Sequence, residues 1–172
     1  MINNRHSYRG DFLRDPVPRE DLITIMKAGL AAPSGCNKQT TSLICVDDPT
    51  LLKKIYAVTG FGIETAPAII CVLTRKIVAW AGKCYNVQDY SAAIENMLLA
   101  IIALGYESCW YEGYLTDEDR IGARVAKILH VPDEYELIGI LPVGIAERRS
   151  VGPKKKEFGE RAWFNGFQNR EE

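Results

Sequence analysis

The sequence contains very little histidine and no paired cysteines. Its two histidines, His6 and His130, are too few for a histidine-rich metal centre, so we expect no bound metal. The five cysteines are an odd number and form no Cys-x-x-Cys pair, which argues against a disulfide framework and against a zinc site. Cysteine usage of this kind favours a reducing compartment, and we expect a cytoplasmic protein.

An excess of charge of either sign is also missing. Lysine and arginine number 21 against 22 acidic residues, so no overall field draws the chain to nucleic acid or to an anionic membrane. The longest apolar run, residues 97–104, is far shorter than the roughly 20 residues of a membrane-spanning helix. The N-terminal residues are polar, so we expect no signal peptide. No Gly-x-Gly-x-x-Gly, P-loop or Gly-x-Ser-x-Gly motif is present.

A chain of 172 residues with 47% hydrophobic and 25% charged residues suits one globular domain. We expect residues 1–172 to form a single domain in which residues 146–172 are an extended C-terminal tail. The tail is polar and then aromatic, with Lys154, Lys155 and Lys156 followed by Phe158, Trp163, Phe164 and Phe167. Because a free tail would expose these rings, we expect it to lie across a partner subunit or back on its own body.

Hydrophobic periodicity indicates helices and strands mixed without regular β-α-β spacing. Helices are predicted at residues 19–32, 50–56, 89–104 and 116–129, and strands at 41–46, 66–73, 108–111 and 137–143. One face of the first helix is predicted to hold Leu22, Ile25, Met26, Gly29 and Leu30. This mixture predicts the α+β fold class.

The predicted helix 89–104 is the most informative element. Asp89 is suited to cap its N-terminus, and Gly105 stands where a glycine commonly ends a helix. Between them almost no polar face remains, and a helix that is apolar all round must be buried on all sides. A small domain buries only about 70% of its surface, so we expect an obligate dimer with this helix in or beside the interface. The alternative is a monomer that encloses the helix between sheet and helices.

Four short segments have the chemistry of ligand binding. In an extended stretch Arg5, Ser7 and Arg9 point the same way, which suits a phosphate and a second polar group. Residues 32–39 follow a helix stop and contain small residues that let backbone approach a ligand. Residues 110–114 run from a strand end into a glycine, and the lysines at 154–156 suit a phosphate. Each segment alone also fits an ordinary reading as a solvated arm, connection, turn or charge run.

Taken together and in this order, six pieces of the sequence resemble the FMN-dependent nitroreductase family. The pieces are Arg5-His6-Ser7-x-Arg9, Ala32-Pro33-Ser34-x-x-Asn37-x-Gln39, the helical stretch Ala93–Ala100, Tyr111-Glu112-Gly113, Pro142-Val143-Gly144 and Lys154-Lys155-Lys156. They span nearly the whole chain, whose length is similar to that of the short, compact members. Thr40 departs from the pattern, because proline usually follows the Asn-x-Gln segment.

The resemblance implies an α+β sandwich with a mostly antiparallel sheet flanked by helices, and a homodimer with FMN at the subunit interface. It implies that Arg5, His6 and Ser7 hold the FMN phosphate and ribityl chain, and that Arg9 lies near N1 and O2 of the flavin. Lining of the flavin from the partner subunit is implied for Pro33, Ser34, Gly35 and Asn37. The backbone of Glu112 and Gly113 is expected near N5 and O4, and Lys154 and Lys156 are expected to neutralise the phosphate.

The function implied by the resemblance is an FMN-dependent oxidoreductase. It would take electrons from NAD(P)H and reduce nitroaromatic, quinone or similar small acceptors by a ping-pong mechanism. Because the flavin would carry the chemistry, no catalytic side chain is expected. Two alternatives stay open: a flavoenzyme of the same fold with another redox task, such as dehalogenation or a biosynthetic oxidation, and a flavin-binding or redox-sensing protein without turnover.

Overall fold

A four-stranded antiparallel sheet forms the centre of the protein. The structure is a computed structural model that describes residues 2–60 and 62–167. The strands are β1 (Thr41–Val46), β2 (Ala68–Thr74), β3 (Tyr111–Glu112) and β4 (Glu136–Val143), and they lie in the order β1-β2-β4-β3. Every pair in the sheet is antiparallel. The α+β class and the antiparallel sheet are therefore confirmed.

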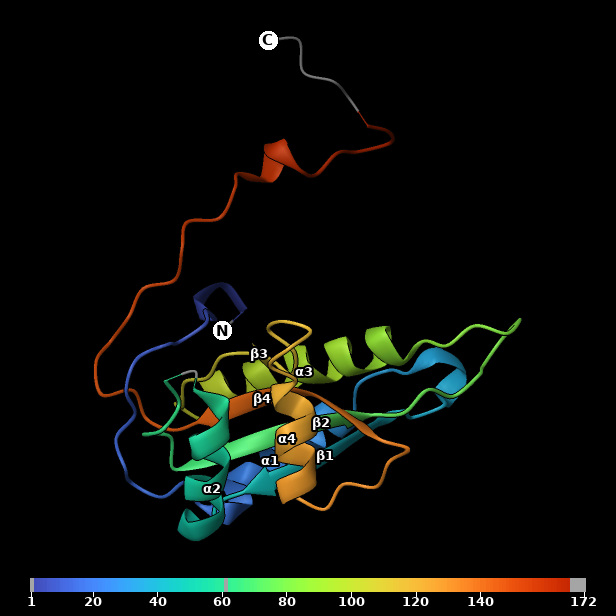
Figure 1. Cartoon of the computed structure of the whole chain (residues 1–172). Helices are drawn as coiled ribbons and strands as arrows, with labels where there is room; N and C mark the ends of the chain where they lie inside the picture. Colours follow the sequence, from blue (N-terminus) through green and yellow to red (C-terminus); the bar gives the residue numbers. More distant parts are fainter. Residues whose placement is uncertain (1, 61, 168–172) are drawn as a thin grey trace.

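Helices cover both faces of this sheet (Figure 1). On one face lie α1 (Arg19–Leu30) and α3 (Asn86–Ala103), and on the other lie α2 (Pro49–Thr59) and α4 (Ile121–Ile128). Three short 3₁₀ turns, η1 (Ile2–Asn4), η2 (Gly35–Asn37) and η3 (Phe158–Glu160), complete the elements of the described residues.

Strand β2 is buried on both of its faces. Ala68, Ile70 and Val72 pack with α1 and α3, whereas the alternate residues Ile69, Cys71 and Leu73 pack with α2 and α4. Side chains alternate between the two faces of a strand, so a strand between two helical layers must be apolar at every position. This explains the continuous apolar run that predicted a buried strand here.

Helix α3 differs from its prediction in two ways. It begins at Asn86 rather than Asp89, so Asp89 lies inside the first turn and its side chain is buried instead of capping the helix end. Only one face of α3 is buried in the core, because the residues on the other face, Ala92, Leu99 and Ile102, remain partly exposed. The predicted glycine end is confirmed, since Gly105 has a φ of 88°.

Other element boundaries also differ. The predicted helix 116–129 is divided: Thr116 and Asp119 form a turn through mutual side-chain to backbone bonds of 2.7 and 3.1 Å, and α4 begins only at Ile121. The strand predicted at 108–111 is limited to Tyr111–Glu112 and one bridge from Glu107 to Gly144. Leu30 was predicted on the buried face of α1, yet it is 59% exposed because it lies in the last turn, beyond the packed part of the helix.

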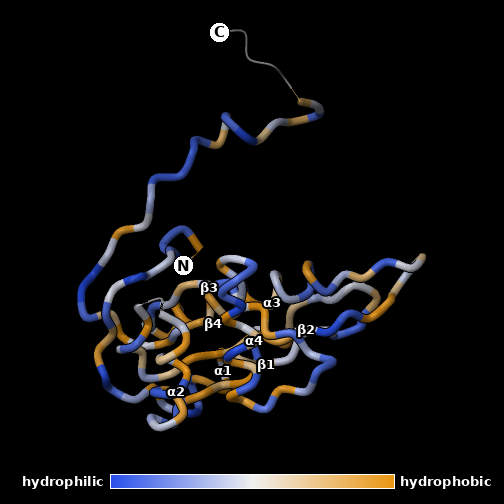
Figure 2. Tube along the Cα trace, in the orientation of Figure 1, coloured by the Kyte–Doolittle hydropathy of each residue, from blue (hydrophilic) through white to orange (hydrophobic). Residues whose placement is uncertain are grey.

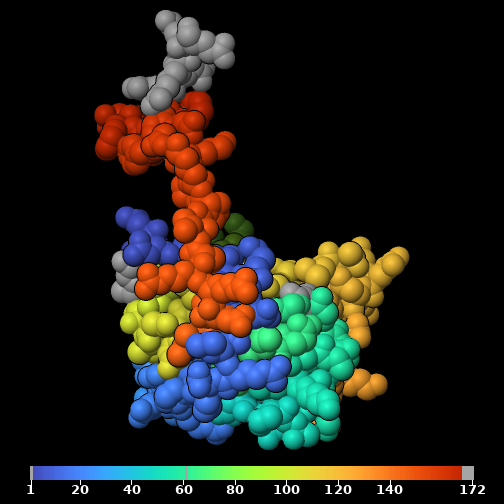
Figure 3. Space-filling model, turned by 90° about the vertical axis from the view of Figure 1, so that its left-hand side faces the viewer, coloured from blue at the N-terminus to red at the C-terminus, as the bar shows by residue number. Residues whose placement is uncertain are grey.

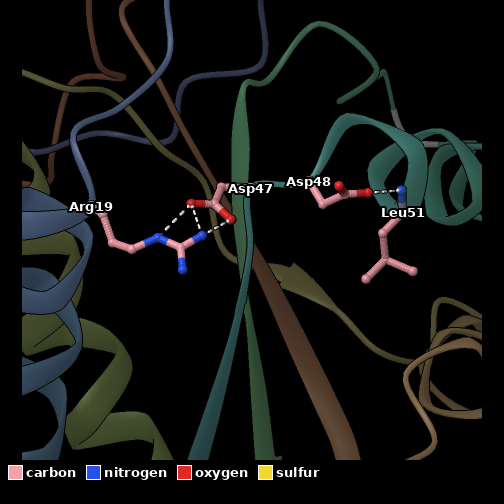
Figure 4. Close-up of polar contacts among 4 residues, drawn as sticks. All are labelled: Arg19, Asp47, Asp48 and Leu51. Carbon is pink, nitrogen blue, oxygen red and sulfur yellow. Dashed lines mark hydrogen bonds and ion pairs between the residues drawn. The ribbon is translucent and has the colours of Figure 1, made fainter.

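The turn between β1 and α2 shows how two neighbouring aspartates act on different elements. Asp48 caps α2, its carboxylate accepting a 2.8 Å bond from the Leu51 N–H. Asp47 instead accepts bonds from the Arg19 guanidinium, including one of 3.0 Å from Nε (Figure 4). The first contact starts a helix, and the second ties α1 to the end of β1.

The C-terminal residues leave the body of the protein. In Figures 1 and 3 the red segment extends away from the sheet and its helices, and in Figure 2 much of the segment is hydrophilic. Phe158, Phe164 and Phe167 are exposed, and the tail's rings contact one another, Trp163 and Phe167 at 4.2 Å. Within one chain the aromatic part of the tail, Phe158–Phe167, therefore does not fold back over the body. In the part of the chain that the structure describes, no helix has the length and apolar character to span a membrane.

The core position of α3 generates a stability prediction. Ile94→Ala is expected to lower the free energy of unfolding by about 2–5 kcal/mol, because the fully buried Ile94 side chain leaves a cavity. Gln88→Ala, on the exposed side of the same helix, should change it by less than about 0.5 kcal/mol. Urea denaturation of the two variants measures the difference, and equal losses would contradict this packing.

Candidate functional site

The N-terminal segment and the beginning of the C-terminal tail lie side by side. Backbone bonds join Leu13 to Ile145 (2.8 Å) and Glu147 to Asp11 (2.9 Å). Farther along, His6 Nε2 and the Ser150 hydroxyl are 2.6 Å apart. Figure 3 shows the blue N-terminal segment and the orange segment together on one side of the molecule. Sequence positions almost at opposite ends of the chain thus form one surface.

Two cavities lie along this surface, which we call the arm surface (residues 3–11 and 147–155). A cavity of about 550 Å³ is lined by His6, Ser7, Arg9, Arg148 and Arg149, together with the acidic Asp11 and Glu147 and others. A second cavity of about 310 Å³ is lined by Arg5, His6 and Lys155, among others. The surface therefore presents guanidinium, ammonium, imidazole and hydroxyl groups, the donor set that binds a phosphate.

Tyr8 anchors the N-terminal segment and sets which side chains turn outward. It is 3% exposed, its N–H donates to the Ser108 carbonyl at 2.9 Å, and its ring contacts Phe12 edge-on at 5.0 Å. With Tyr8 turned into the body, its neighbours Ser7 and Arg9 line the larger cavity. Arg5 lines the smaller cavity instead and forms an ion pair of 3.2 Å with Glu95 of α3.

Arg9 is electrostatically linked to the start of β3. Burial is the main cause that raises the pKa of Tyr111, and the positive charge of Arg9 lowers it in part. The charge of Arg9 is therefore felt at Tyr111, the first residue of a second group of predicted site residues, 111–113.

Within that segment the two backbone donors differ. The Gly113 N–H is already engaged, since it donates to the Ile138 carbonyl at 2.9 Å. Antiparallel pairs alternate between bonded and non-bonded positions, so the neighbouring pair Glu112–Gly139 turns the Glu112 backbone towards the open edge of the sheet. The main-chain group that a ligand can reach here is that of Glu112.

The segment 33–40 has an unusual backbone. Three residues that are not glycine have positive φ angles: Cys36 (51°), Asn37 (53°) and Gln39 (48°). Such conformations are costly for side chains with a Cβ, and they concentrate at functional sites. Gly35 itself packs so closely on Tyr85 that an added Cβ would lie 2.5 Å from the Tyr85 Cβ.

Pro33 and Ser34 are not part of the arm surface within one chain. They line a separate cavity of about 180 Å³ with Gln39, Thr41 and Asp89, among others. None of its lining residues lines either arm cavity. The predicted site residues therefore form two groups in one protomer: the arm surface with β3, and the 33–40 segment.

Within the lysine run, Lys155 and the predicted Lys154 and Lys156 lie in different surroundings. Lys155 lines the smaller arm cavity, whereas Lys154 and Lys156 are exposed and Lys154 pairs with Glu157 at 3.6 Å. Sequence reasoning also missed Arg148 and Arg149. The sequence offered only their adjacent charge as a signal, and their cavity exists only because chain segments far apart in sequence meet.

A partly buried acid, Glu107, lies close to the arm surface. Glu107 Oε2 and the neighbouring Ser108 Oγ are buried without a hydrogen-bond partner among the described residues. Burial raises the pKa of Glu107, and the nearby His6 lowers it in part. No group of three or more His, Cys, Asp or Glu within the described ranges could hold a metal ion.

Comparison with known proteins identifies the family and the fold of this chain. The profile described as "Nitroreductase family" matches residues 2–60 and 54–145. A relative from Archaeoglobus fulgidus, named as a candidate NADH dehydrogenase/NAD(P)H nitroreductase, is 34% identical over 84% of this chain and 82% of its own. A solved structure with the same description from Parabacteroides distasonis has a TM-score of 0.82, with 27% identity and 96% of each chain covered. An FMN-dependent nitroreductase from Clostridium difficile superposes with a TM-score of 0.81, with 26% identity and 97% and 100% covered.

The partly buried Glu107 generates a pH prediction. The raised pKa means that the Glu107 carboxyl keeps its proton to higher pH in the folded protein than in the unfolded chain. Its contribution to stability is therefore present below the unfolded-state pKa and is lost as the pH rises through the folded-state pKa. Glu107→Gln is always neutral and should melt at the same temperature as the wild type near pH 4 but higher at pH 7–8. Thermal unfolding across this range measures it, with the exposed Glu134→Gln as control. A melting-temperature difference between Glu107→Gln and the wild type that stays the same at every pH would contradict the raised pKa of Glu107.

Proposed function

The chain belongs to the nitroreductase family and is an NAD(P)H-dependent flavin oxidoreductase, and we propose that its arm surface binds FMN and that its acceptors are small nitroaromatic or quinone compounds. The observation that carries the proposal is the arm surface, where residues from the two ends of the chain line adjoining cavities. When bound, FMN accepts a hydride from NAD(P)H and delivers the electrons to the acceptor.

The residues of the arm surface fit this cofactor. FMN ends in one phosphate of about two negative charges, which requires charge-assisted donors. Arg5, His6 and Ser7 lie along the two cavities, and Lys155, Arg148 and Arg149 face them from the other segment. Gly152 is needed for this fit, because an added Cβ would lie 2.7 Å from the His6 Cβ.

We assign the remaining roles by position. Arg9, which reaches the start of β3 electrostatically, provides a fixed cation where the flavin ring gains negative charge on reduction. The outward-facing backbone of Glu112 donates to the ring, and Gly113 allows the close pairing of β3 with β4 because an added Cβ would lie 2.5 Å from the Leu137 carbonyl. Lys154 and Lys156 add positive charge to the phosphate side.

Pro33, Ser34, Gly35 and Asn37 are proposed to act on the partner's flavin in a homodimer. Three observations support the dimer: the 33–40 segment lies apart from the arm surface, the outer face of α3 leaves Leu99 and Ile102 partly exposed, and the tail beyond residue 146 carries exposed aromatic rings away from the body. A second copy would cover the apolar face and give the tail a surface to lie on. The proposed unit is one domain, residues 1–172, with this tail as its extension.

The acceptor and the donor are proposed to use one pocket in turn, a ping-pong mechanism. No side chain need transfer a proton to the substrate for this, which suits a chain with two histidines. Parallel double-reciprocal lines in steady-state kinetics with NADH or NADPH and a nitroaromatic or quinone acceptor would support it. Intersecting lines would contradict it.

The proposal predicts a yellow protein that releases FMN, and not FAD, on denaturation, because the arm surface matches one terminal phosphate. Chromatography of the released cofactor tests this, and anaerobic NAD(P)H should bleach the flavin absorbance. Bleaching without turnover of any acceptor would indicate a flavin-binding protein instead. A colourless protein that FMN cannot reconstitute would refute the proposal. Because a homodimer is proposed, light scattering on the same sample should give a molecular mass above the 19.2 kDa of one chain.

Substitution of Arg9 should change the flavin midpoint potential, whereas substitution of the lysines should change the affinity for FMN. Arg9→Ala removes a cation beside charge that appears only on reduction, so it should lower the flavin midpoint potential while oxidised FMN still binds. Lys154→Ala with Lys156→Ala acts on a phosphate whose charge is constant, so it should weaken binding in both redox states, by about 1–3 kcal/mol, with the potential nearly unchanged. Only an interaction that differs between two states shifts their balance.

Spectroelectrochemical potentials and FMN dissociation constants of the variants measure this contrast. Lys155→Ala is the matched comparison, because Lys155 is the lysine that lines the arm cavity. A lysine variant that shifts the potential as far as Arg9→Ala does would show that these residues are wrongly assigned around the flavin.

A further inference from the structure

We propose that Asp89 is a positioning residue that holds the segment 33–40 in the shape required to bind flavin. The inference rests on the proposed function, because the segment carries Pro33, Ser34, Gly35 and Asn37. It assigns to Asp89 a role that acts through its neighbours in the segment.

Asp89 belongs to the first turn of α3 and is buried against the 33–40 segment, with 4% of its surface exposed. Its Oδ1 accepts a 2.8 Å bond from the Gly35 N–H, and its Oδ2 accepts a 2.7 Å bond from the Thr40 hydroxyl. Thr40 is itself 1% exposed. One carboxylate thus holds the segment near both of its ends, and the residues between these two bonds are those with the unusual backbone.

The backbone between the anchors needs such a restraint. Cys36, Asn37 and Gln39 all have positive φ angles, a region that residues with a Cβ occupy only when the surroundings enforce it. Inside the segment the Asn37 and Lys38 N–H groups donate to the Ser34 and Gly35 carbonyls at 3.0 and 3.1 Å, and the Gln39 N–H donates to the Ser34 hydroxyl at 3.0 Å. These bonds are local to the segment, whereas those of Asp89 fix it to α3. Without Asp89 the chain between residues 35 and 40 would relax to more ordinary angles and move Ser34 and Asn37.

The carboxylate offers a charged acceptor to each of its two donors. An asparagine would still accept from the Gly35 N–H, but its N–H₂ group would donate to the Thr40 hydroxyl oxygen, so the second bond would be reversed and both contacts would be neutral. The first turn of α3 favours a negative charge at this position. Thr40 stands where the family resemblance would place a proline, which has no hydroxyl, so this second anchor depends on this chain's own residue.

The contacts of Asp89 separate positioning from simple support of a helix. Among the described residues, both hydrogen-bond donors to the Asp89 carboxylate lie in the 33–40 segment, and neither lies in α3. Asp48 is the opposite case, because its carboxylate bonds the Leu51 N–H in its own helix α2 (Figure 4). Asp48→Ala is therefore the matched control: it removes a structural aspartate that has no contact with the segment.

The experiment compares Asp89→Ala, Asp89→Asn and Thr40→Val with Asp48→Ala in the full-length protein. FMN affinity of the apoprotein is measured by quenching of flavin fluorescence, melting temperature by circular dichroism, and the Gly35 amide by hydrogen exchange. We expect Asp89→Ala to weaken FMN binding at least tenfold and to speed exchange of the Gly35 amide at least tenfold. Asp89→Asn, which replaces the carboxylate with a neutral amide, and Thr40→Val, which removes one of the two anchors, should each weaken binding by a few fold. Asp48→Ala should lower the melting temperature with FMN affinity and Gly35 exchange unchanged.

The outcomes distinguish this inference from the proposed function. If the wild type does not bind FMN, the proposed function fails and the positioning role falls with it. If the wild type binds FMN but Gly35 exchange and FMN affinity stay at wild-type values in the Asp89 and Thr40 variants, the positioning role alone is wrong. Should Asp89→Ala fail to fold, Thr40→Val decides, because it removes one hydroxyl and preserves the shape of the side chain. Losses that merely follow melting temperature, equal to those of Asp48→Ala, would also overturn the proposal.

Discussion

Burial of β2 on both faces is the constraint on which the rest of the structure depends. A strand that turns Ile70 to one helical layer and Ile69 to the other can be shielded from water only if both layers are present. The layer of α1 and α3 carries the 33–40 segment at one end and Glu95, the partner of Arg5, farther along α3. The packing that hides the sheet therefore also sets where the candidate ligand-binding segments emerge.

Electrostatics then separates two kinds of surface. The arm surface gathers cations from both ends of the chain around open cavities, with fewer acids among them, and a ligand phosphate would neutralise them. Asp89 presents the reverse arrangement, a buried anion satisfied by the backbone of Gly35 and the hydroxyl of Thr40. The positive charge at the arm surface is suited to attract a ligand. The negative charge of Asp89 is instead satisfied by hydrogen bonds within the protein and stabilises a strained backbone.

One protomer leaves apolar surface that a second copy would cover. The outer face of α3 presents Leu99 and Ile102, and the tail presents Phe158, Phe164 and Phe167. The same chain divides its proposed flavin contacts between two separate places. A homodimer would cover the exposed apolar surface and would bring the two groups of flavin contacts together. In this proposal, assembly and cofactor binding therefore depend on the same interface.

The sequence alone determined the elements that local pattern controls: strand Thr41–Val46, the apolar run of β2, the glycine end of α3 and the α+β class. Family-like motifs in the expected order also identified the candidate residues, because a motif is a local property. Contacts between distant segments were decided only by the tertiary structure. Asp89 is of a residue type that commonly caps helices and stands where the pattern predicts a helix start. It is instead buried against Gly35 and Thr40, because α3 begins three residues earlier and packs on the 33–40 segment. Likewise, the pairing of His6 with Ser150 brings Lys155 to the arm cavity. No sequence pattern reports which of two distant segments will approach, since that depends on the summed packing of the whole core.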